Sequence, residues 1–155
     1  MIPKEMIESS LTLMRTAPAA YLTTIDENGY PVTRAMLNLH NAEQFPTLRN
    51  TLEAEENPFM VYFTTNTSSD KVTHLRANGK VAVYFCDPGR FHGLMLSADA
   101  EVLTDAEIKR RFWVEGWQRY YPRGVDDSDY AIVKAVPRSA RGWYQTRTFE
   151  FSPEG

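Results

Sequence analysis

The feature that most constrains the fold is a series of short strand-like runs, separated by turns and a few helical segments without regular strand–helix alternation. Apolar, β-branched and aromatic residues concentrate in such runs. The predicted strands are Ala20–Ile25, Tyr30–Leu39, Phe59–Thr64, Val81–Cys86, Phe91–Leu103, Ala131–Val136 and Gly142–Phe151. Six or seven strands in mostly antiparallel order predict a mainly β barrel with short helices. A Rossmann-type fold is disfavoured, and no G-x-G-x-x-G segment follows a strand.

Turn and capping signals divide these strands. The segment Asp26–Gly29 predicts a hairpin between the first two, because glycine can take the positive φ that such turns need. The small residues Ser97 and Ala98 would permit a bend in the long fifth strand. Four helices are predicted. The first begins near Pro3, the second is a weakly helical segment at 46–57, and the third begins near Lys71. The fourth runs from about Asp105 to Trp113 and starts with a Thr104–Glu107 capping box. Residues 120–129 are expected to be irregular.

Size, charge and cysteine content exclude several classes of protein. The 155 residues fit one domain, 1–155, and 17 basic against 20 acidic residues leave no basic stripe for nucleic acid. The single cysteine, Cys86, permits no disulfide framework and is expected in the core. No apolar run approaches the roughly 20 residues that span a bilayer, and the first ten residues lack an apolar signal core. We therefore expect a cytoplasmic protein without membrane or nucleic-acid partners.

The most informative stretch for chemistry runs from Phe63 to Lys71, where a strand end leads through hydroxyl residues into a helix start. Unpaired N–H groups and the positive end of the helix dipole favour an anion there, and Ser69 and Lys71 add a donor and a charge. Plain helix capping explains the same serine-rich stretch equally simply. Arg34, within a strand, suits a phosphate through its paired N–H donors, although an edge-strand arginine can also be merely solvated. Met36 and Leu37 would offer an apolar surface to a flat ring.

Other reactive residues form no recognisable constellation. His40, His74 and His92 lack metal-ligand spacing, and His74 is expected on a helix surface. The acidic residues look solvated rather than opposed across a cleft, and no nucleophile has a visible partner. The aromatic residues of the second half fit a packed core as well as a ring-stacking site; they are Trp113, Trp117, Tyr120, Tyr121, Trp143 and Tyr144.

Taken in order, several short motifs resemble the pyridoxamine 5'-phosphate oxidase-related superfamily of FMN-binding split barrels, and in particular its short members of the general-stress-protein type. The resemblance covers nearly the whole chain. The motifs are Asn28–Pro31 with Arg34, Phe63–Thr65, Ser69–Lys71 with Leu75, Val81–Phe85, Ser97–Val102, Trp113 and Trp143. The resemblance implies a six- to seven-stranded antiparallel split β-barrel that binds FMN.

The resemblance also assigns roles to individual residues. It implies that the second strand and the end of the third contact the flavin, through Arg34, Ala35, Met36, Leu37, Asn38, Thr64 and Thr65. Ser69 and Lys71 fall where the family holds the phosphate, in agreement with the anion site inferred from the helix start. Trp143 falls where relatives bring a tryptophan from the second subunit, which implies a homodimer with an interfacial flavin.

Three positions depart from the family pattern. Asp70 stands where the true oxidases carry a further basic residue, and we expect its carboxylate to point away from the phosphate. Ala98 replaces a frequent glycine, which a negative φ would make harmless. No Arg-x-His substrate motif follows Trp143. Oxidation of vitamin B6 phosphates is therefore not expected.

These observations favour an FMN-dependent oxidoreductase that acts on an unidentified small molecule and is fed by an electron donor such as a reduced nicotinamide. The flavin would perform the chemistry, so no side chain is needed as catalytic acid or base. Two alternatives remain open at this point. One is a flavin-binding stress or sensor protein without turnover, and the other is a split-barrel binder of haem or a deazaflavin.

Overall fold

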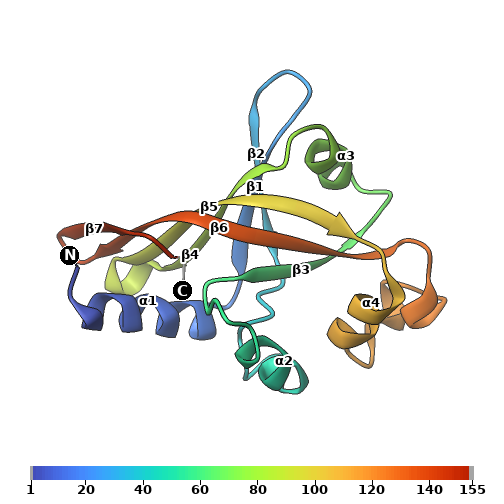
Figure 1. Ribbon diagram of the computed structural model, residues 1–155, viewed down its shortest axis with the longest axis horizontal. Coiled ribbons are helices and arrows are strands. Elements are labelled where there is room, and N and C mark those ends of the chain that lie inside the picture. The colour runs from blue at the N-terminus through green and yellow to red at the C-terminus, as the bar shows by residue number, and fades with distance from the viewer. Residues whose placement is uncertain (1, 154–155) are drawn as a thin grey trace.

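The structure, a computed structural model, describes residues 2–153 and consists of one curled antiparallel sheet with short helices around it (Figure 1). The strand order is β2-β1-β4-β5-β6-β3, and β7 pairs with β6. The strands are β1 Ala20–Ile25, β2 Pro31–Met36, β3 Val61–Asn66, β4 Lys80–Asp87, β5 His92–Leu103, β6 Tyr130–Tyr144 and β7 Arg147–Phe151. The sheet forms a half-barrel, so the prediction of a mainly β split barrel is confirmed.

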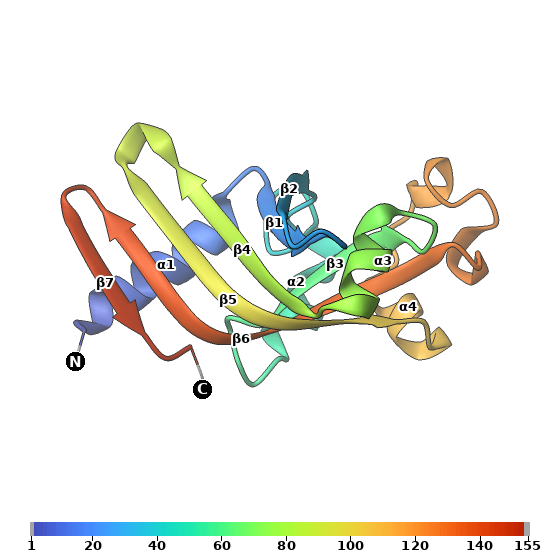
Figure 2. The ribbon, with the colours of Figure 1, turned by 90° about the horizontal axis from the view of Figure 1, so that it is seen from above.

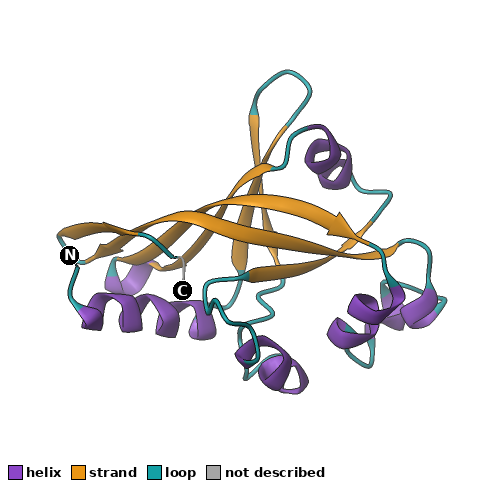
Figure 3. Cartoon of the chain, viewed as in Figure 1, coloured by secondary structure: helices purple, strands orange, loops and turns teal. Residues whose placement is uncertain are grey.

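The helices lie at the periphery of the sheet (Figure 3). They are α1 Lys4–Thr16, α2 Arg49–Glu53, α3 Asp70–Ala77 and α4 Ala106–Phe112. Seen from above, β4, β5, β6 and β7 run side by side while α1 crosses beneath them (Figure 2). Within residues 2–153, no helix is long and apolar enough to cross a membrane.

Two apolar clusters fill the two faces of the sheet. The first fills the concave side of the barrel and includes Leu22, Phe63, Phe85 and Leu94. The second lies under α2 and α4 and is rich in aromatic rings; it includes Tyr62, Phe112, Trp117, Tyr121 and Tyr130, with Trp113 packed against it. Core packing therefore accounts for Trp113, Trp117 and Tyr121, whereas Tyr120 is exposed and Trp143 and Tyr144 lie at the other end of β6.

The last two strands differ from the prediction, because β6 runs without interruption through Pro137 to Tyr144. Residues 136–139 pair with neither β3 nor β7, so the missing N–H of Pro137 leaves no ladder bond broken on that side. The predicted strand Gly142–Phe151 is instead split by a two-residue turn, in which Gln145 adopts φ 55°. No glycine marks this turn, which explains why the sequence did not reveal it.

The predicted bend in β5 is confirmed. The pairing of β5 with β6 shifts register between Ser97 and Ala98, where β6 contributes one extra residue, Arg138. Ala98 has no positive φ, so an alanine is accommodated where relatives often have glycine. At the start of α4, Asp105 rather than Thr104 is the N-cap, since its carboxylate accepts from the Ile108 N–H at 3.3 Å.

The exit of β2 is anchored by Asn38, whose side chain is buried. Its amide nitrogen donates to the carbonyl oxygens of Met14 at 2.7 Å and Ala17 at 2.9 Å, where α1 ends. Its oxygen accepts from the His40 N–H at 3.2 Å. Asn38 thereby satisfies carbonyl groups at the end of α1 and fixes where the edge strand β2 leaves the sheet.

We predict that Asn38→Ala lowers the free energy of unfolding by about 3 kcal/mol, because it removes the donor to the Met14 carbonyl, one of two donors to the Ala17 carbonyl and the acceptor of the His40 N–H. The melting temperature should fall by roughly 6–12 °C in thermal unfolding followed by circular dichroism. Asn50→Ala, on the exposed surface of α2, is the matched control and should change it little. Equal losses for the two variants would contradict the anchoring role.

Candidate functional site

An open hollow of about 520 Å³ lies between the β1–β2 hairpin and the start of α3. Two elements supply its basic groups, since Arg34 comes from β2 and Lys71 from α3. Its lining residues are Asp26, Glu27, Val32, Arg34, Ser69, Asp70, Lys71, Thr73 and His74. The fold thus brings together Arg34, Ser69 and Lys71, which the sequence nominated separately for an anion.

The side chain of Ser69 does not cap the start of α3. Ser69 is the N-cap residue, with ψ 153°, but its side chain makes no capping hydrogen bond to α3. Its hydroxyl instead lies 3.3 Å from the Thr65 hydroxyl. Because capping does not use the Ser69 side chain, the first N–H groups of α3 and this hydroxyl are available to a ligand.

The two cations of the hollow are partly desolvated and close to each other. Burial lowers the pKa of Lys71, and the Arg34 guanidinium lowers it further. Burial also lowers the pKa of Arg34. Among residues 2–153, no carboxylate lies within ion-pair distance of either side chain. An anion placed between them would relieve both the desolvation and the repulsion.

Asp70 does not point away from the hollow as we expected, because it is among the lining residues. Its charge raises the pKa of Arg34 and of Lys71, against the larger effect of burial. Its position follows from that of Lys71, since the two are adjacent in the first turn of α3. The lining of the hollow therefore combines two cations, Arg34 and Lys71, with three carboxylates, of which Asp70 is the one that acts on both cations.

Asp129 holds the loop that leads into α3. Its carboxylate accepts hydrogen bonds from Asn66 Nδ2 at 2.6 Å, Thr67 Oγ1 at 3.0 Å, and the Ser68 N–H at 2.9 Å. The bonds from Asn66 and from the Ser68 backbone lower the pKa of Asp129 to about 2. The sequence analysis missed this residue, which lies 61 to 63 positions away from the loop residues that it orders.

Arg34 is held in place from β1. Its Nη1 donates to Thr24 Oγ1 at 2.7 Å and to the Leu22 carbonyl oxygen at 3.3 Å. Thr24 Oγ1 in turn lies 2.9 Å from His74 Nδ1. His74 is buried, so the expectation that it lies on the helix surface was wrong. Its polar partner Thr24 alternates with Leu22 on the buried face of β1. A threonine at an inward position of a strand was the signal in the sequence that a buried polar partner was needed.

The other residues of β2 and its exit that were predicted to contact the flavin alternate between the two faces of the strand. Met36 faces inward with Arg34 and packs against the first apolar cluster, whereas Ala35 and Leu37 are exposed. The resemblance implies a backbone contact for Asn38, and both ends of its side-chain amide are engaged at α1 and His40. Any contact of Asn38 with a ligand would have to come from its backbone.

Thr64 and Thr65 lie on opposite faces of β3. Thr65 is buried and faces Ser69, while Thr64 lies near the Tyr121 side chain in the second cluster. Both residues nevertheless share the outer edge of β3, which pairs only with β6. β2 is the other edge of the sheet and pairs only with β1. Edge strands present unpaired backbone N–H and C=O groups, so both predicted flavin-contacting strands offer such groups.

Trp143 lies far from this hollow within the chain. It pairs with Gly93 at the start of β5, whereas the end of α3 adjoins Ala100. Seven residues of β5 separate these positions, or about 23 Å. Trp143 and Tyr84 line a separate hollow of about 350 Å³. Cys86 lines the same hollow and is half-buried, so its predicted place in the core was wrong.

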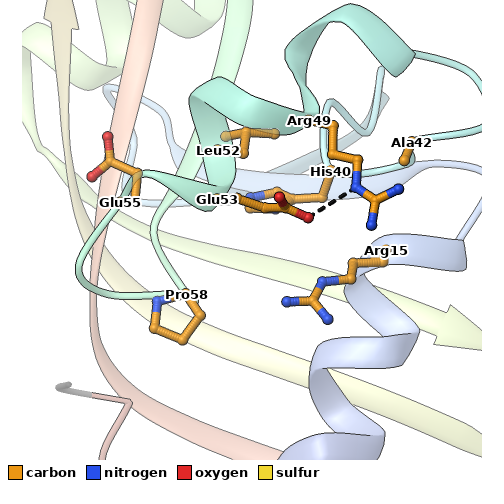
Figure 4. A pocket seen from close by; sticks show the side chains of 8 residues that line it. All are labelled: Arg15, His40, Ala42, Arg49, Leu52, Glu53, Glu55 and Pro58. Carbon is orange, nitrogen blue, oxygen red and sulfur yellow. Dashed lines mark hydrogen bonds and ion pairs between the residues drawn. The ribbon is translucent and has the colours of Figure 1, made fainter.

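A second hollow with basic residues, of about 310 Å³, lies between α1 and α2 (Figure 4). Arg15 and Arg49 extend into it from these two helices, but Arg49 is paired with Glu53 at 2.9 Å. Burial lowers the pKa of His40 to about 4, so this side chain is neutral and adds no positive charge to the hollow. None of the residues nominated from the sequence lines this hollow, so the site beside α3 is the stronger candidate. In the described part of the chain, no cluster of potential metal ligands occurs.

Comparison with protein families matches residues 6–144 to the family described as pyridoxamine 5'-phosphate oxidase. A comparison with curated protein sequences finds no match. Among solved structures, the chain is similar to a Clostridium acetobutylicum protein related to general stress protein 26 of B. subtilis, from the pyridoxinephosphate oxidase family. The two are 28% identical, with a TM-score of 0.78 over 97% of this chain and 96% of that one.

Two other structural neighbours carry names that refer to different ligands. An F420 reductase is 18% identical, with a TM-score of 0.58 over 90% of this chain and 98% of that one. A haem-binding protein from Mycobacterium smegmatis is 12% identical, with a TM-score of 0.68 over 99% of this chain and 60% of that one. At these identities the likeness shows the shared fold alone.

We predict that Asp129→Asn lowers stability above about pH 4 by about 1 kcal/mol, allowing for solvent exposure, or roughly 2–4 °C in melting temperature. The folded-state pKa of Asp129 lies below that of the unfolded chain. Its stabilising effect is therefore present above about pH 4 and is lost as the pH falls towards about 2.

Thermal unfolding of both proteins between about pH 2 and 7 is the measurement, and the two melting curves should converge at the acid end. Asp126→Asn, at an exposed position of the same segment, is the control. A difference between wild type and Asp129→Asn that stays constant with pH would exclude the carboxylate as its cause.

Proposed function

Because this chain belongs to the pyridoxamine 5'-phosphate oxidase family, we propose that it binds FMN and serves as an FMN-dependent oxidoreductase for a small molecule. One observation carries the proposal. Arg34 and Lys71, two partly buried cations without an ion-pair partner among residues 2–153, line one hollow at the start of a helix. A phosphate dianion supplies the charge that this arrangement lacks.

The phosphate end of FMN would be held by three kinds of donor. Arg34 and Lys71 provide charge, the Ser69 hydroxyl provides a hydrogen bond, and the first N–H groups of α3 point towards the same space. The ring would extend along the open edges of β2 and β3, where Ala35, Met36, Leu37, Asn38, Thr64 and Thr65 offer backbone groups. These groups could tune the ring through its nitrogens and carbonyls.

The chemistry of this proposal resides in the cofactor, since bound FMN supplies hydride or electron transfer. The protein would bind the phosphate, orient the ring and exclude competing reactions, which requires no catalytic acid or base. Residues 144–155 contain no Arg-x-His motif. The substrate that we propose is a small molecule other than a vitamin B6 phosphate, with the electrons drawn from a donor such as a reduced nicotinamide.

We also propose that the chain is a homodimer with the flavin at the interface. An aromatic face, defined by Tyr21, Tyr84, Phe91 and Trp143, is formed by residues of β1, β4 and β6 and of the turn that precedes β5. Tyr21 and Tyr84 are cross-strand neighbours, and the rings of Tyr84 and Trp143 lie 6.1 Å apart. Phe91 is 75% exposed. A second copy would cover this face and could bring its own Trp143 to the cofactor.

The visible spectrum of the purified protein is the first test of the ligand, because oxidised flavin, haem and a deazaflavin absorb differently. A flavin spectrum with reduction by a nicotinamide and reoxidation by an acceptor supports the oxidoreductase. A flavin that is bound but not turned over by any donor and acceptor pair would indicate a stress or sensor protein. A haem or deazaflavin spectrum would overturn the FMN assignment.

We predict that Lys71→Ala weakens FMN binding roughly tenfold to hundredfold but leaves riboflavin binding nearly unchanged, because only FMN carries the phosphate. Arg34→Ala should show the same preference, and Ser69→Ala a smaller effect because backbone donors remain. Titration of flavin fluorescence measures both affinities. Lys4→Ala, which removes the same charge from the exposed start of α1, is the control. Equal losses for FMN and riboflavin would contradict the phosphate role.

We predict that the wild-type chain sediments as a dimer at micromolar concentration and that Phe91→Glu shifts it towards monomer. The substitution places a charge on the aromatic face at a residue that contributes little to the fold of one subunit. Tyr120→Glu, at an exposed tyrosine outside this face, should leave the dimer intact. A wild-type monomer that binds FMN tightly would exclude the interfacial site.

A further inference from the structure

Hydrogen bonds between three side chains, Arg34, Thr24 and His74, connect β2 with α3, the two elements that supply the cations of the hollow. Arg34 Nη1 lies 2.7 Å from Thr24 Oγ1, and Thr24 Oγ1 lies 2.9 Å from His74 Nδ1. Thr24 has no solvent-exposed surface, and His74 is also buried. Both bonds are therefore shielded from water, and the hydrogen positions must satisfy every group within the chain itself.

The direction of these hydrogen bonds follows from the chemistry of the three groups. A guanidinium can only donate, so Arg34 donates and the Thr24 oxygen accepts. Thr24 Oγ1 is buried, and among residues 2–153 its only other hydrogen-bond partner is His74 Nδ1, so the hydroxyl hydrogen is satisfied when Thr24 donates it to Nδ1. A nitrogen that accepts carries no proton, which fixes the neutral imidazole of His74 with its hydrogen on Nε2.

The Nε2 atom of His74 is a donor that takes no part in the hydrogen bonds between these three side chains. No group among residues 2–153 is hydrogen-bonded to it, and it is not a buried atom lacking a partner, so it reaches solvent. His74 is among the residues that line the hollow together with Arg34 and Lys71. His74 follows Lys71 by three residues in α3, a spacing that places both side chains on one face of the helix.

We propose that His74 is a fourth side chain that binds the anion, beside Arg34, Lys71 and Ser69, and that it donates from Nε2–H to the phosphate. Thr24 orients it and selects its tautomer. The inference rests on the proposed function, and it adds a neutral, directional donor to two charges. The site would thereby favour a terminal phosphate oxygen at a defined position over a diffuse negative charge.

The tautomer can be measured without any flavin. Long-range ¹H–¹⁵N correlation spectra of the untagged apoprotein at about pH 8 distinguish a protonated Nε2 from a protonated Nδ1. The chain contains only three histidines, so His74→Asn identifies the signal. We expect the Nε2–H form, with its Nε2 resonance shifted on addition of FMN or inorganic phosphate. A protonated Nδ1, or a resonance that neither ligand shifts, would overturn the proposal.

Two substitutions separate the two nitrogens of the ring. His74→Asn retains an acceptor near the Nδ1 position but removes the donor at Nε2, whereas His74→Gln can place an amide donor near Nε2 and lacks the acceptor for Thr24. We expect His74→Asn to weaken FMN roughly tenfold without affecting riboflavin, and His74→Gln to stay within about threefold of wild type. His40→Asn, which lines the other hollow, should leave both affinities unchanged.

The outcomes also separate this proposal from the proposed function. Normal FMN affinity in His74→Asn together with weak affinity in His74→Gln would show that His74 only positions Arg34, which contradicts direct binding. If the wild-type protein does not bind FMN, the proposed function fails. The phosphate-dependent shift of the Nε2 resonance still decides whether His74 contacts an anion, and it does not depend on whether the variants fold.

Discussion

The pairing of β5 with β6 is the constraint on which the rest of the architecture depends. These are the two longest strands, His92–Leu103 and Tyr130–Tyr144, and they pair along nearly their whole length. The extra residue at Arg138 bends the pair, so the sheet curls instead of remaining flat. The first part of β6 pairs with β3 and its last part with β7, while β4 pairs with β5. The curl leaves β2 and β3 as the two edges of a half-barrel.

That curl also explains why the chain needs two apolar clusters. Tyr130, Ala131, Ile132 and Val133 are all buried in succession, which is unlike the alternation of a strand with one solvated face. Val133 faces the concave cluster and Ile132 the aromatic one. The segment between α4 and β6 covers the second face with rings, and its last residues supply Asp129, which fixes the loop before α3. Packing of the aromatic cluster is thereby coupled to the geometry of the anion site.

The sequence predicted elements better than it predicted their surroundings. The Asp26–Gly29 hairpin and the Ser97–Ala98 bend were recoverable because glycine, small residues and periodicity act locally. The course of β6 through Pro137 was not, because tolerance of a proline there depends on where β3 ends and β7 begins. Such information lies in the tertiary pairing and not in the neighbouring residues.

The same distinction applies to the candidate site. Arg34, Ser69 and Lys71 could be nominated from residue type and helix-start chemistry, and the fold brings them to one hollow. The buried environment of His74, the position of Asp70 and the occupied amide of Asn38 could not be foreseen. Each depends on a partner more than 20 residues away or on which face of a helix meets the sheet.

The two ends of the proposed site place different demands on the sequence. At the anion end, binding requires side chains with charge and direction, so Arg34, Lys71 and His74 are identifiable as individuals. At the ring end, the groups offered are the backbone N–H and C=O groups of the edges of β2 and β3, which many side chains can accompany. The proposed site therefore specifies a phosphate more strictly than it specifies a ring. That specificity belongs to these side chains and not to the fold, which is shared by proteins named for F420 and for haem, a ligand without a phosphate.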